Sequence, residues 1–297
     1  MNNFSFLGLV LTLISTLVYA TQTALIKFMG AAISVPVLVF IQAVVCFVLI
    51  SLVILLQGKQ APSLLRTAHP VIHIFRTFFS LGISYFLFYC VKFVPLVDAM
   101  LLTNTAPLWI PFLAFIFTGR KINHKLWPGL VIGFIGILLV LNPDKHVFNG
   151  AALLGLAAGI CMASSAMLVG EAKKDKGLTN LFYYFLFSIP ISAIGAAIFW
   201  QPMSGKMWLV LIGIGALFFI VQFSMTYALK FINVQTFASL YLSNIIFAAI
   251  IGIIVWHYPL TPMICIGVIL TILGAIFTIR MQSRIVSPLP TKAITHE

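Results

Sequence analysis

Charged residues are scarce in this sequence, and acidic residues are the scarcest. Lys, Arg, Asp and Glu make up 7% of the 297 residues, and only 5 residues are acidic. An ordinary soluble domain carries about a quarter charged residues, so the composition excludes that class. None of the acids lies in the middle of an apolar segment. The buried carboxylate that proton-coupled membrane carriers commonly use therefore has no candidate here.

Motifs of several catalytic and metal-binding classes are also missing. Cys46, Cys90, Cys161 and Cys265 each stand alone in an apolar segment, with no CxxC pair and no histidine at ligand spacing. They indicate core residues rather than disulfides or metal ligands. No GxxxxGKS/T phosphate loop and no Ser/His/Asp group at a common depth occur, so we expect no enzyme activity and no cofactor.

Long apolar runs dominate what is present, since 62% of the residues are hydrophobic. A helix needs about 20 apolar residues to cross a bilayer, where its backbone groups must bond internally. Ten segments meet this requirement and predict an all-α integral membrane protein. The first is too long for a signal peptide and lacks a basic leader. The predicted spans are 5–27, 35–57, 71–93, 97–118, 125–142, 149–170, 179–200, 206–230, 234–256 and 260–281.

The net charge of +12 is distributed unevenly between the two sides of these spans. If the N-terminus is cytoplasmic, thirteen Lys and Arg residues fall on that side, and Lys27, Lys92, Lys145 and Lys206 fall on the other. This bias predicts a multi-pass inner-membrane protein with both termini in the cytoplasm, and it requires no nucleic acid partner. The thirteen are Lys59, Arg66, Arg76, Arg120, Lys121, Lys125, Lys173, Lys174, Lys176, Lys230, Arg280, Arg284 and Lys292.

The two halves of the chain repeat the same sequence pattern. "YCVKF" at 89–93 returns as "YALKF" at 227–231, and at the same offset Gly129 falls on Gly267 and Gly136 on Gly274. The register predicts two five-helix repeats, 1–142 and 143–282, with the linker "NPDKHVF" between them and a cytoplasmic tail at 283–297. Because five is odd, the second repeat must enter the membrane in the opposite direction, as in many secondary transporters.

Specific motifs carry a resemblance to a known family. Arg76 opens the third span, "YCVKF" ends it, "PLVDA" (95–99) forms the following turn, and Pro107 breaks the fourth span. With ten spans in two halves, the chain resembles the drug/metabolite transporter superfamily, EamA type, over nearly its whole length. That family often has Gly-Glu after the fourth and ninth spans, where this chain has Gly119-Arg120 and His257-Tyr258.

The resemblance implies a carrier that moves small organic metabolites by alternating access. Substrates of similar proteins include amino acids, S-adenosylmethionine and quaternary amines. Because no buried formal charge except Arg76 awaits a substrate, the residues favour an amino acid or a related zwitterion or cation, moved by a facilitator or exchanger. An S-adenosylmethionine or nucleotide-like uptake carrier is the alternative within transporters, and a lipid-handling or scaffold membrane protein is the alternative outside them.

Polar side chains inside the spans are the candidate substrate contacts, because such groups are costly in lipid. Asn104, Gln22, Gln222 and Asn244 are the strongest, since an amide has more donors and acceptors than one backbone contact satisfies. The hydroxyls of Ser15, Ser84 and Ser164 are more often used in helix packing. The predicted substrate-binding set is Ser15, Tyr19, Gln22, Arg76, Ser84, Asn104, Ser164, Gln222, Tyr241 and Asn244.

Aromatic and basic residues leave two interpretations open. Tyr19 and Tyr241 lie deep enough to stack on a planar or cationic substrate, whereas Tyr183 and Tyr184 are interpreted as interfacial anchors. Arg76 either extends to the membrane surface or captures a carboxylate or phosphate. His69 and His73 have no acidic partner within the sequence pattern and are interpreted as interfacial.

Glycine pairs predict close helix contacts. Gly129 with Gly133, and Gly155 with Gly159, form GxxxG motifs. Either motif serves packing within the bundle or a homodimer, and the sequence does not decide between them.

Overall fold

The computed structural model describes residues 3–58, 61–67, 69–119, 123–141, 150–171, 175–232, 234–258 and 261–286. Within these residues every regular element is helical, and nine segments are long and apolar enough to cross a membrane. The fifth predicted span is a shorter apolar helix. The uninterrupted long helices are α1 (Asn3–Met29), α2 (Val35–Leu55), α4 (Pro70–Phe93), α7 (Trp127–Leu141), α8 (Gly150–Glu171), α9 (Gly177–Ile198), α10 (Gly205–Ala228) and α13 (Pro262–Val286).

Some predictions concern positions outside the described residues. They are the linker, most of the expected tail, and the basic residues Lys59, Arg120, Lys121, Lys145, Lys173, Lys174 and Lys292. Short helices occupy three connections: η1 (Gly30–Ala32), α3 (Ala61–Leu64) and η3 (His124–Leu126).

Two spans are broken in the middle. The fourth consists of α5 (Leu96–Thr103) and α6 (Ala106–Thr118), and the ninth of α11 (Val234–Tyr241) and α12 (Ser243–Trp256). The first break follows from Pro107, which has no N–H for the carbonyl of Thr103 and whose ring would clash with it. The second break, at Leu242, has no proline.

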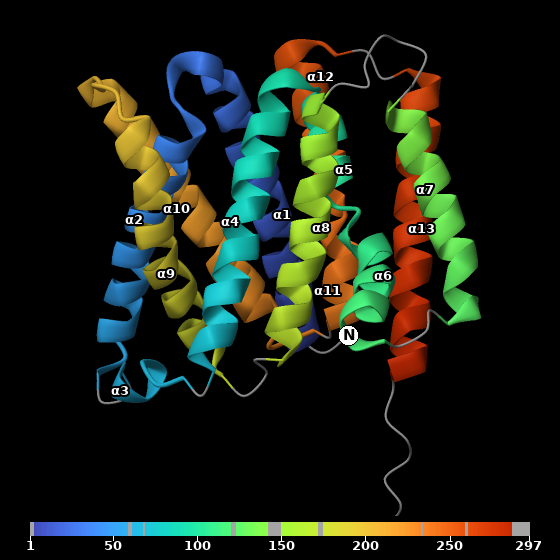
Figure 1. Cartoon of the computed structure of the whole chain (residues 1–297), viewed down its shortest axis with the longest axis horizontal. Coiled ribbons are helices and arrows are strands. Elements are labelled where there is room, and N and C mark those ends of the chain that lie inside the picture. The colour runs from blue at the N-terminus through green and yellow to red at the C-terminus, as the bar shows by residue number, and fades with distance from the viewer. Residues whose placement is uncertain are drawn as a thin grey trace, which may run out of the picture.

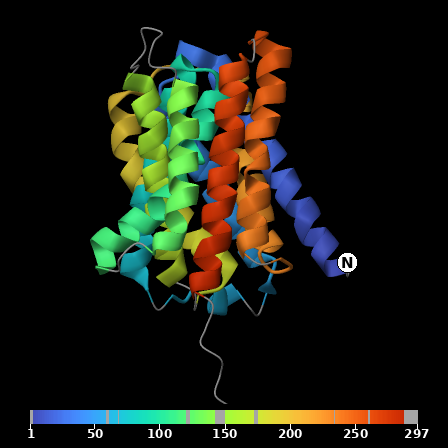
Figure 2. The ribbon, with the colours of Figure 1, turned by 90° about the vertical axis from the view of Figure 1, so that its right-hand side faces the viewer.

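The helices form a bundle in which the two broken spans lie between α8 and the pair α7 and α13 in the view of Figure 1, and Figure 2 shows the bundle from the side. The closest neighbours are α7 with α13, α4 with α8, α2 with α9, and α1 with α10, while α5 contacts α12. The pair α7 and α13 stands at one edge, and α2, α9 and α10 stand at the other (Figure 1). The beginning of α1 and the end of α13 lie at the same end of the bundle, as an even number of crossings requires (Figure 1).

Glycines allow the close approach of the edge pair. A side chain at Gly136 would meet Thr271 and the carbonyl of Gly267, and one at Gly274 would meet Gly133 and the carbonyl of Gly129. Without a hydrophobic drive between helices in lipid, such backbone contact is a main source of association. The first GxxxG motif therefore packs within the bundle.

The second GxxxG motif also faces the bundle interior. A side chain at Gly155 would meet Leu102, and one at Gly159 would meet Thr105 and the carbonyl of Leu102. Helix α8 thus packs closely against the broken fourth span, where the backbone of α5 gives way to that of α6.

The two broken spans end in the same backbone conformation. Gly119 closes α6 with φ 65°, and His257 closes α12 with φ 54°. The left-handed region is natural for glycine and strained for histidine. They are the two glycine positions of the Gly-Glu pattern, of which this chain keeps the first and has histidine at the second.

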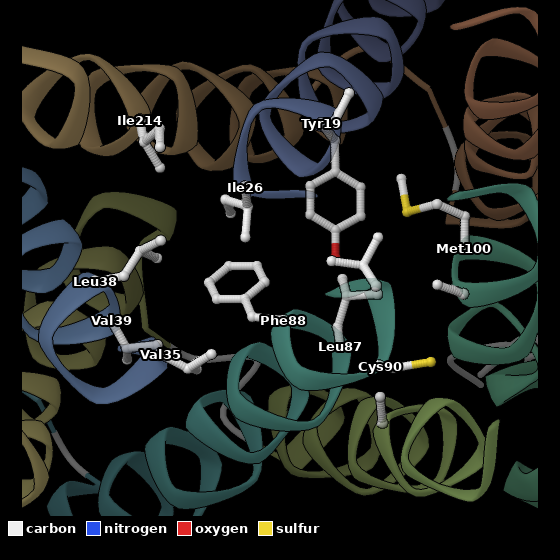
Figure 3. Close-up of a cluster of buried hydrophobic side chains, with 14 of the residues drawn as sticks. Tyr19, Ile26, Val35, Leu38, Val39, Leu87, Phe88, Cys90, Met100 and Ile214 are labelled. Atoms are coloured by element: carbon white, nitrogen blue, oxygen red, sulfur yellow. The ribbon is translucent and has the colours of Figure 1, made fainter. Parts of the chain in front are cut away.

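The largest group of buried apolar side chains joins helices of both halves (Figure 3). Ile26 from α1, Leu38 from α2, Phe88 from α4 and Ile214 from α10 meet there. Tyr19 extends from α1 into this group, beside Leu87 and Met100 (Figure 3). The phenol of Tyr19 therefore lies in the apolar core, next to helices that carry other predicted substrate contacts.

Candidate functional site

Two buried amides meet where the broken spans are interrupted. Asn104 caps the end of α5, and Asn244 is the second residue of α12. The Asn104 Nδ2 donates to the Asn244 Oδ1 at 3.1 Å, and the Asn244 Nδ2 donates back to the Asn104 Oδ1 at 3.3 Å. The Asn104 Nδ2 also donates to the Met100 carbonyl at 2.7 Å. The structure thus brings together two predicted residues that are 140 positions apart.

An aromatic stack runs from α1 to α11. The rings of Tyr19 and Tyr241 are stacked with centroids 6.2 Å apart, and Phe237 stacks on Tyr241 at 5.5 Å. All three side chains are buried. The two tyrosines that the sequence placed deep in the membrane therefore contact each other, while Phe237 gave no distinguishing signal in its apolar surroundings.

Gln22 has an amide partner that sequence reasoning missed. Its Nε2 donates to the Oε1 of Gln42 at 2.9 Å, and both residues are buried. The Gln22 Oε1 is sealed from solvent and has no hydrogen-bond partner. Gln42 is a lone amide in the apolar α2 helix. A single amide in an otherwise apolar span could have identified Gln42 from the sequence.

Arg76 points into the bundle, toward α9. Its Nη1 donates to the Asn180 carbonyl at 3.0 Å, and its guanidinium carbon lies 5.6 Å from the ring centre of Tyr184. Tyr184 is buried, and its phenol lies near Ser84. The interpretation of Tyr184 as an interfacial anchor is therefore wrong, because its side chain is buried inside the bundle beneath the partly buried guanidinium of Arg76. Tyr183 does lie at the end of the bundle, where its hydroxyl donates to the Leu65 carbonyl at 2.8 Å.

The serine hydroxyls mostly bond their own helices. Ser15 donates to the Thr12 carbonyl at 2.9 Å, and Ser164 donates to the Ile160 carbonyl at 3.0 Å. This is the local bonding expected of a hydroxyl used in packing. Ser84, which reaches the Ser80 carbonyl only at 3.5 Å, is the exception through its contact with Tyr184.

Gln222 differs from the other three amides. It is only half-buried on α10, and within the described residues its side-chain amide forms no hydrogen bond. Among the described residues, no hydrogen bond joins it to another member of the predicted set.

A buried histidine and aspartate link the start of α4 to the connection before α9. The His73 Nε2 lies 2.8 Å from the Asp175 Oδ2 and 3.1 Å from the Thr67 Oγ1, and Thr67 donates to the same Asp175 oxygen at 2.6 Å. The ring of His73 also stacks on Tyr183 at 5.2 Å. The expectation that His73 has no acidic partner is wrong. The partner lies 102 positions away, beyond the reach of a local pattern.

Known proteins resemble the chain over different lengths. A riboflavin transporter of Vibrio cholerae serotype O1 is 29% identical over 167 residues, which are 55% of this chain and 56% of that protein. An S-adenosylmethionine uptake transporter of Rickettsia felis is 28% identical over 57% of this chain and 59% of its own. The alignments with these two thus span little more than half of each relative. The pseudopaline exporter CntI of Pseudomonas aeruginosa is 21% identical over 91% and 94%.

The fold itself also has a solved counterpart. One crystal structure superposes with a TM-score of 0.65, at 17% identity, over 95% of this chain and 98% of the other. The model of the EamA-like transporter family matches twice, over residues 6–142 and 149–280. Its named relatives are transporters of small molecules, not enzymes. With helices long enough to span a membrane and a family match over most of its length, this chain belongs to the EamA-like transporter family.

Proposed function

We propose that this protein is a secondary carrier that moves an amino acid, or a related zwitterion or cation, by alternating access. The observation that carries the proposal is the reciprocal pair of Asn104 and Asn244, which joins the interruptions of the two broken spans. Broken helices near the midplane form the binding sites of many secondary transporters, because they present backbone groups and polar side chains to a substrate. The aromatic stack of Tyr19 and Tyr241 supplies the adjoining surface.

Packing between the halves supports an inverted repeat. At the offset of the sequence repeat, the contact of Gly136 with Gly267 corresponds to that of Gly274 with Gly129. The pair α4 and α8 corresponds in the same way to α10 and α1, and α2 with α9 joins equivalent helices. Such reciprocity is what a two-fold relation between two halves produces. An axis in the membrane plane lets the halves exchange conformations and so turn one cavity from one side to the other.

Hydrogen bonds link the two halves at both ends of the bundle. At the end where α1 begins, His73 bonds Asp175, and Tyr183 bonds the Leu65 carbonyl. At the opposite end Ser34 donates to the Phe199 carbonyl at 3.1 Å, and Gln201 donates to that of Ala32 at 3.5 Å. Alternating access requires these two sets of contacts to break in turn.

The proposal also covers how the carrier is driven and how it is oriented in the membrane. We propose a facilitator or exchanger in the inner membrane with cytoplasmic termini. Of the basic residues within described ranges, seven lie toward the end where α1 begins and three toward the other end, which supports that orientation. A homodimer stays a prediction, and because both GxxxG motifs lie inside the bundle it would use another surface.

A second candidate substrate comes from the relatives. Several of them are named S-adenosylmethionine uptake transporters, at 27–28% identity over about half of this chain. Such a molecule combines a zwitterion, a cation and a planar base, which suits the aromatic stack. The candidate of another class, a lipid-handling or scaffold protein, has no counterpart among these names.

Counterflow tests the proposed function. Purified protein is reconstituted in vesicles preloaded with unlabelled amino acids, quaternary amines or S-adenosylmethionine, and uptake of the labelled compound is followed. A carrier takes up the labelled compound faster into preloaded vesicles than into empty ones. If no compound in the panel shows that acceleration, while vesicles with a known carrier do, the proposal fails. Dependence on a proton gradient at clamped membrane potential would separately exclude the facilitator or exchanger.

A further inference from the structure

We infer that Arg76 is an anion-recognition site, and that the carried molecule has a carboxylate or phosphate that binds the side of its guanidinium formed by Nε and Nη2. The inference rests on the proposed function and names the chemical group that the carrier selects. It also decides between the two interpretations that the sequence left open for Arg76.

The hydrogen bonds of Arg76 leave one edge of the guanidinium free. Nη1, which lies on the side of Cδ, is occupied by the Asn180 carbonyl at 3.0 Å. Nε is sealed from solvent and has no hydrogen-bond partner. Nε–H and one N–H of Nη2 point in parallel, which is the arrangement that binds a carboxylate through two bonds. Nη2 forms no hydrogen bond within the described residues.

Among the described side chains, no carboxylate forms an ion pair with Arg76. The ion pair that the described residues form is that of His73 with Asp175, one helical turn away, where the carboxylate is held by the imidazole and by Thr67. The guanidinium itself rests on the ring of Tyr184. A cationic side chain inside a membrane protein is costly and marks a substrate or ion site by default. An anionic substrate group would supply the missing charge.

Groups near Arg76 could also contact the rest of a bound molecule, beyond its anionic group. The phenol of Tyr184 lies near Ser84 and on the side of Tyr19, whose ring stacks on Tyr241. A path of hydroxyl and aromatic groups therefore leads from Arg76 to the aromatic stack. A molecule with an oxyanion at one end and a planar or cationic part at the other matches this path, and a zwitterionic amino acid is the simplest example.

The test compares probes that differ only in the anion. Purified full-length protein is titrated with benzoate against benzamide, L-phenylalanine against L-phenylalaninamide, and flavin mononucleotide against riboflavin, and binding is read from the shift in melting temperature. We expect at least one anionic member to bind about ten-fold more tightly than its partner, as a charge-assisted pair of bonds provides. If no anionic member outbinds its partner in the wild-type protein, the inference is wrong.

Variants assign the preference to the guanidinium. Arg76→Gln should abolish the tighter binding of the anionic probe. Arg76→Lys should reduce it, because lysine keeps the charge but cannot form two parallel hydrogen bonds. Lys230→Gln, an exposed cation over Tyr227 at the same end of the bundle, serves as the matched control and should leave it unchanged. A preference that persists in Arg76→Gln overturns the inference. If Arg76→Gln does not fold, the test uses Arg76→Lys. A preference for the anionic probe that is undiminished in Arg76→Lys also overturns the inference.

Counterflow separates this inference from the proposed function. If the carrier exchanges a compound without any oxyanion, and Arg76→Lys and Arg76→Gln exchange it at the wild-type rate, the carrier stands and the anion site is wrong. If no compound is exchanged at all, the proposed function fails instead.

Discussion

Asn104 and Asn244 each donate one hydrogen bond to the other, at 3.1 and 3.3 Å, across the place where two helices stop and start again. Both amides are buried. Because each oxygen accepts from the opposite nitrogen, the pair is satisfied as a unit and either member alone would leave buried groups without partners. The pair therefore holds the two broken spans in one register, and a substrate that binds beside it must compete for these groups.

Asn104→Ala should lower the free energy of unfolding by about 1–3 kcal/mol, because it leaves the Asn244 amide unsatisfied. A double-mutant cycle with Asn244→Ala should give a coupling energy of about 0.5 kcal/mol or more. Unfolding in mixed micelles measures both, with Ser164→Ala as the control. Additive effects would mean that the two amides do not act as a pair. We also expect Asn104→Ala to lose transport while it keeps its expression.

Gln222→Ala should separate transport from stability. The amide is half-buried and has no side-chain hydrogen bond in the described structure, so its loss should change the free energy of unfolding by less than about 0.5 kcal/mol. Uptake should fall about five-fold if the amide bonds the substrate. Normal uptake would assign Gln222 to helix packing. Ser15→Ala, which removes a hydroxyl bonded within its own helix, should leave uptake near that of the wild type.

His73→Ala should destabilise the protein by about 1–3 kcal/mol, because it removes the imidazole from the Asp175 carboxylate, which keeps Thr67 as a donor. His73→Gln keeps a hydrogen-bond donor and should cost less. Melting temperatures of the two variants in detergent check the order. Equal values for wild type and His73→Ala would show that the pair does not hold α4 to the start of α9.

His257→Gly should stabilise the protein by up to about 1 kcal/mol, since glycine adopts the left-handed conformation at the end of α12 without strain. The gain is limited by the greater flexibility of glycine in the unfolded chain. The reverse change at the matching position, Gly119→His, should lower the melting temperature. A drop for His257→Gly would mean that the imidazole makes a stabilising contact.

The sequence predicted the spans well and the contacts between them poorly, for a physical reason. A membrane span depends on about 20 consecutive side chains, so each apolar run could be read locally, and Pro107 marked the first break. The break at Leu242 has no proline, and its position becomes evident only beside Asn104. Gln42, Tyr184 and Asp175 were missed because each acquires its role from a partner in another helix.

Distance measurements between spin labels at both ends of the bundle test alternating access most directly. After replacement of the four native cysteines, one labelled pair at Arg66 and Lys176 reports the end where α1 begins, and a second pair at Ala31 and Lys206 reports the other end. Addition of a compound that shows counterflow should lengthen one distance and shorten the other in the same sample. If both distances stay fixed, or both lengthen together, the protein does not work by alternating access.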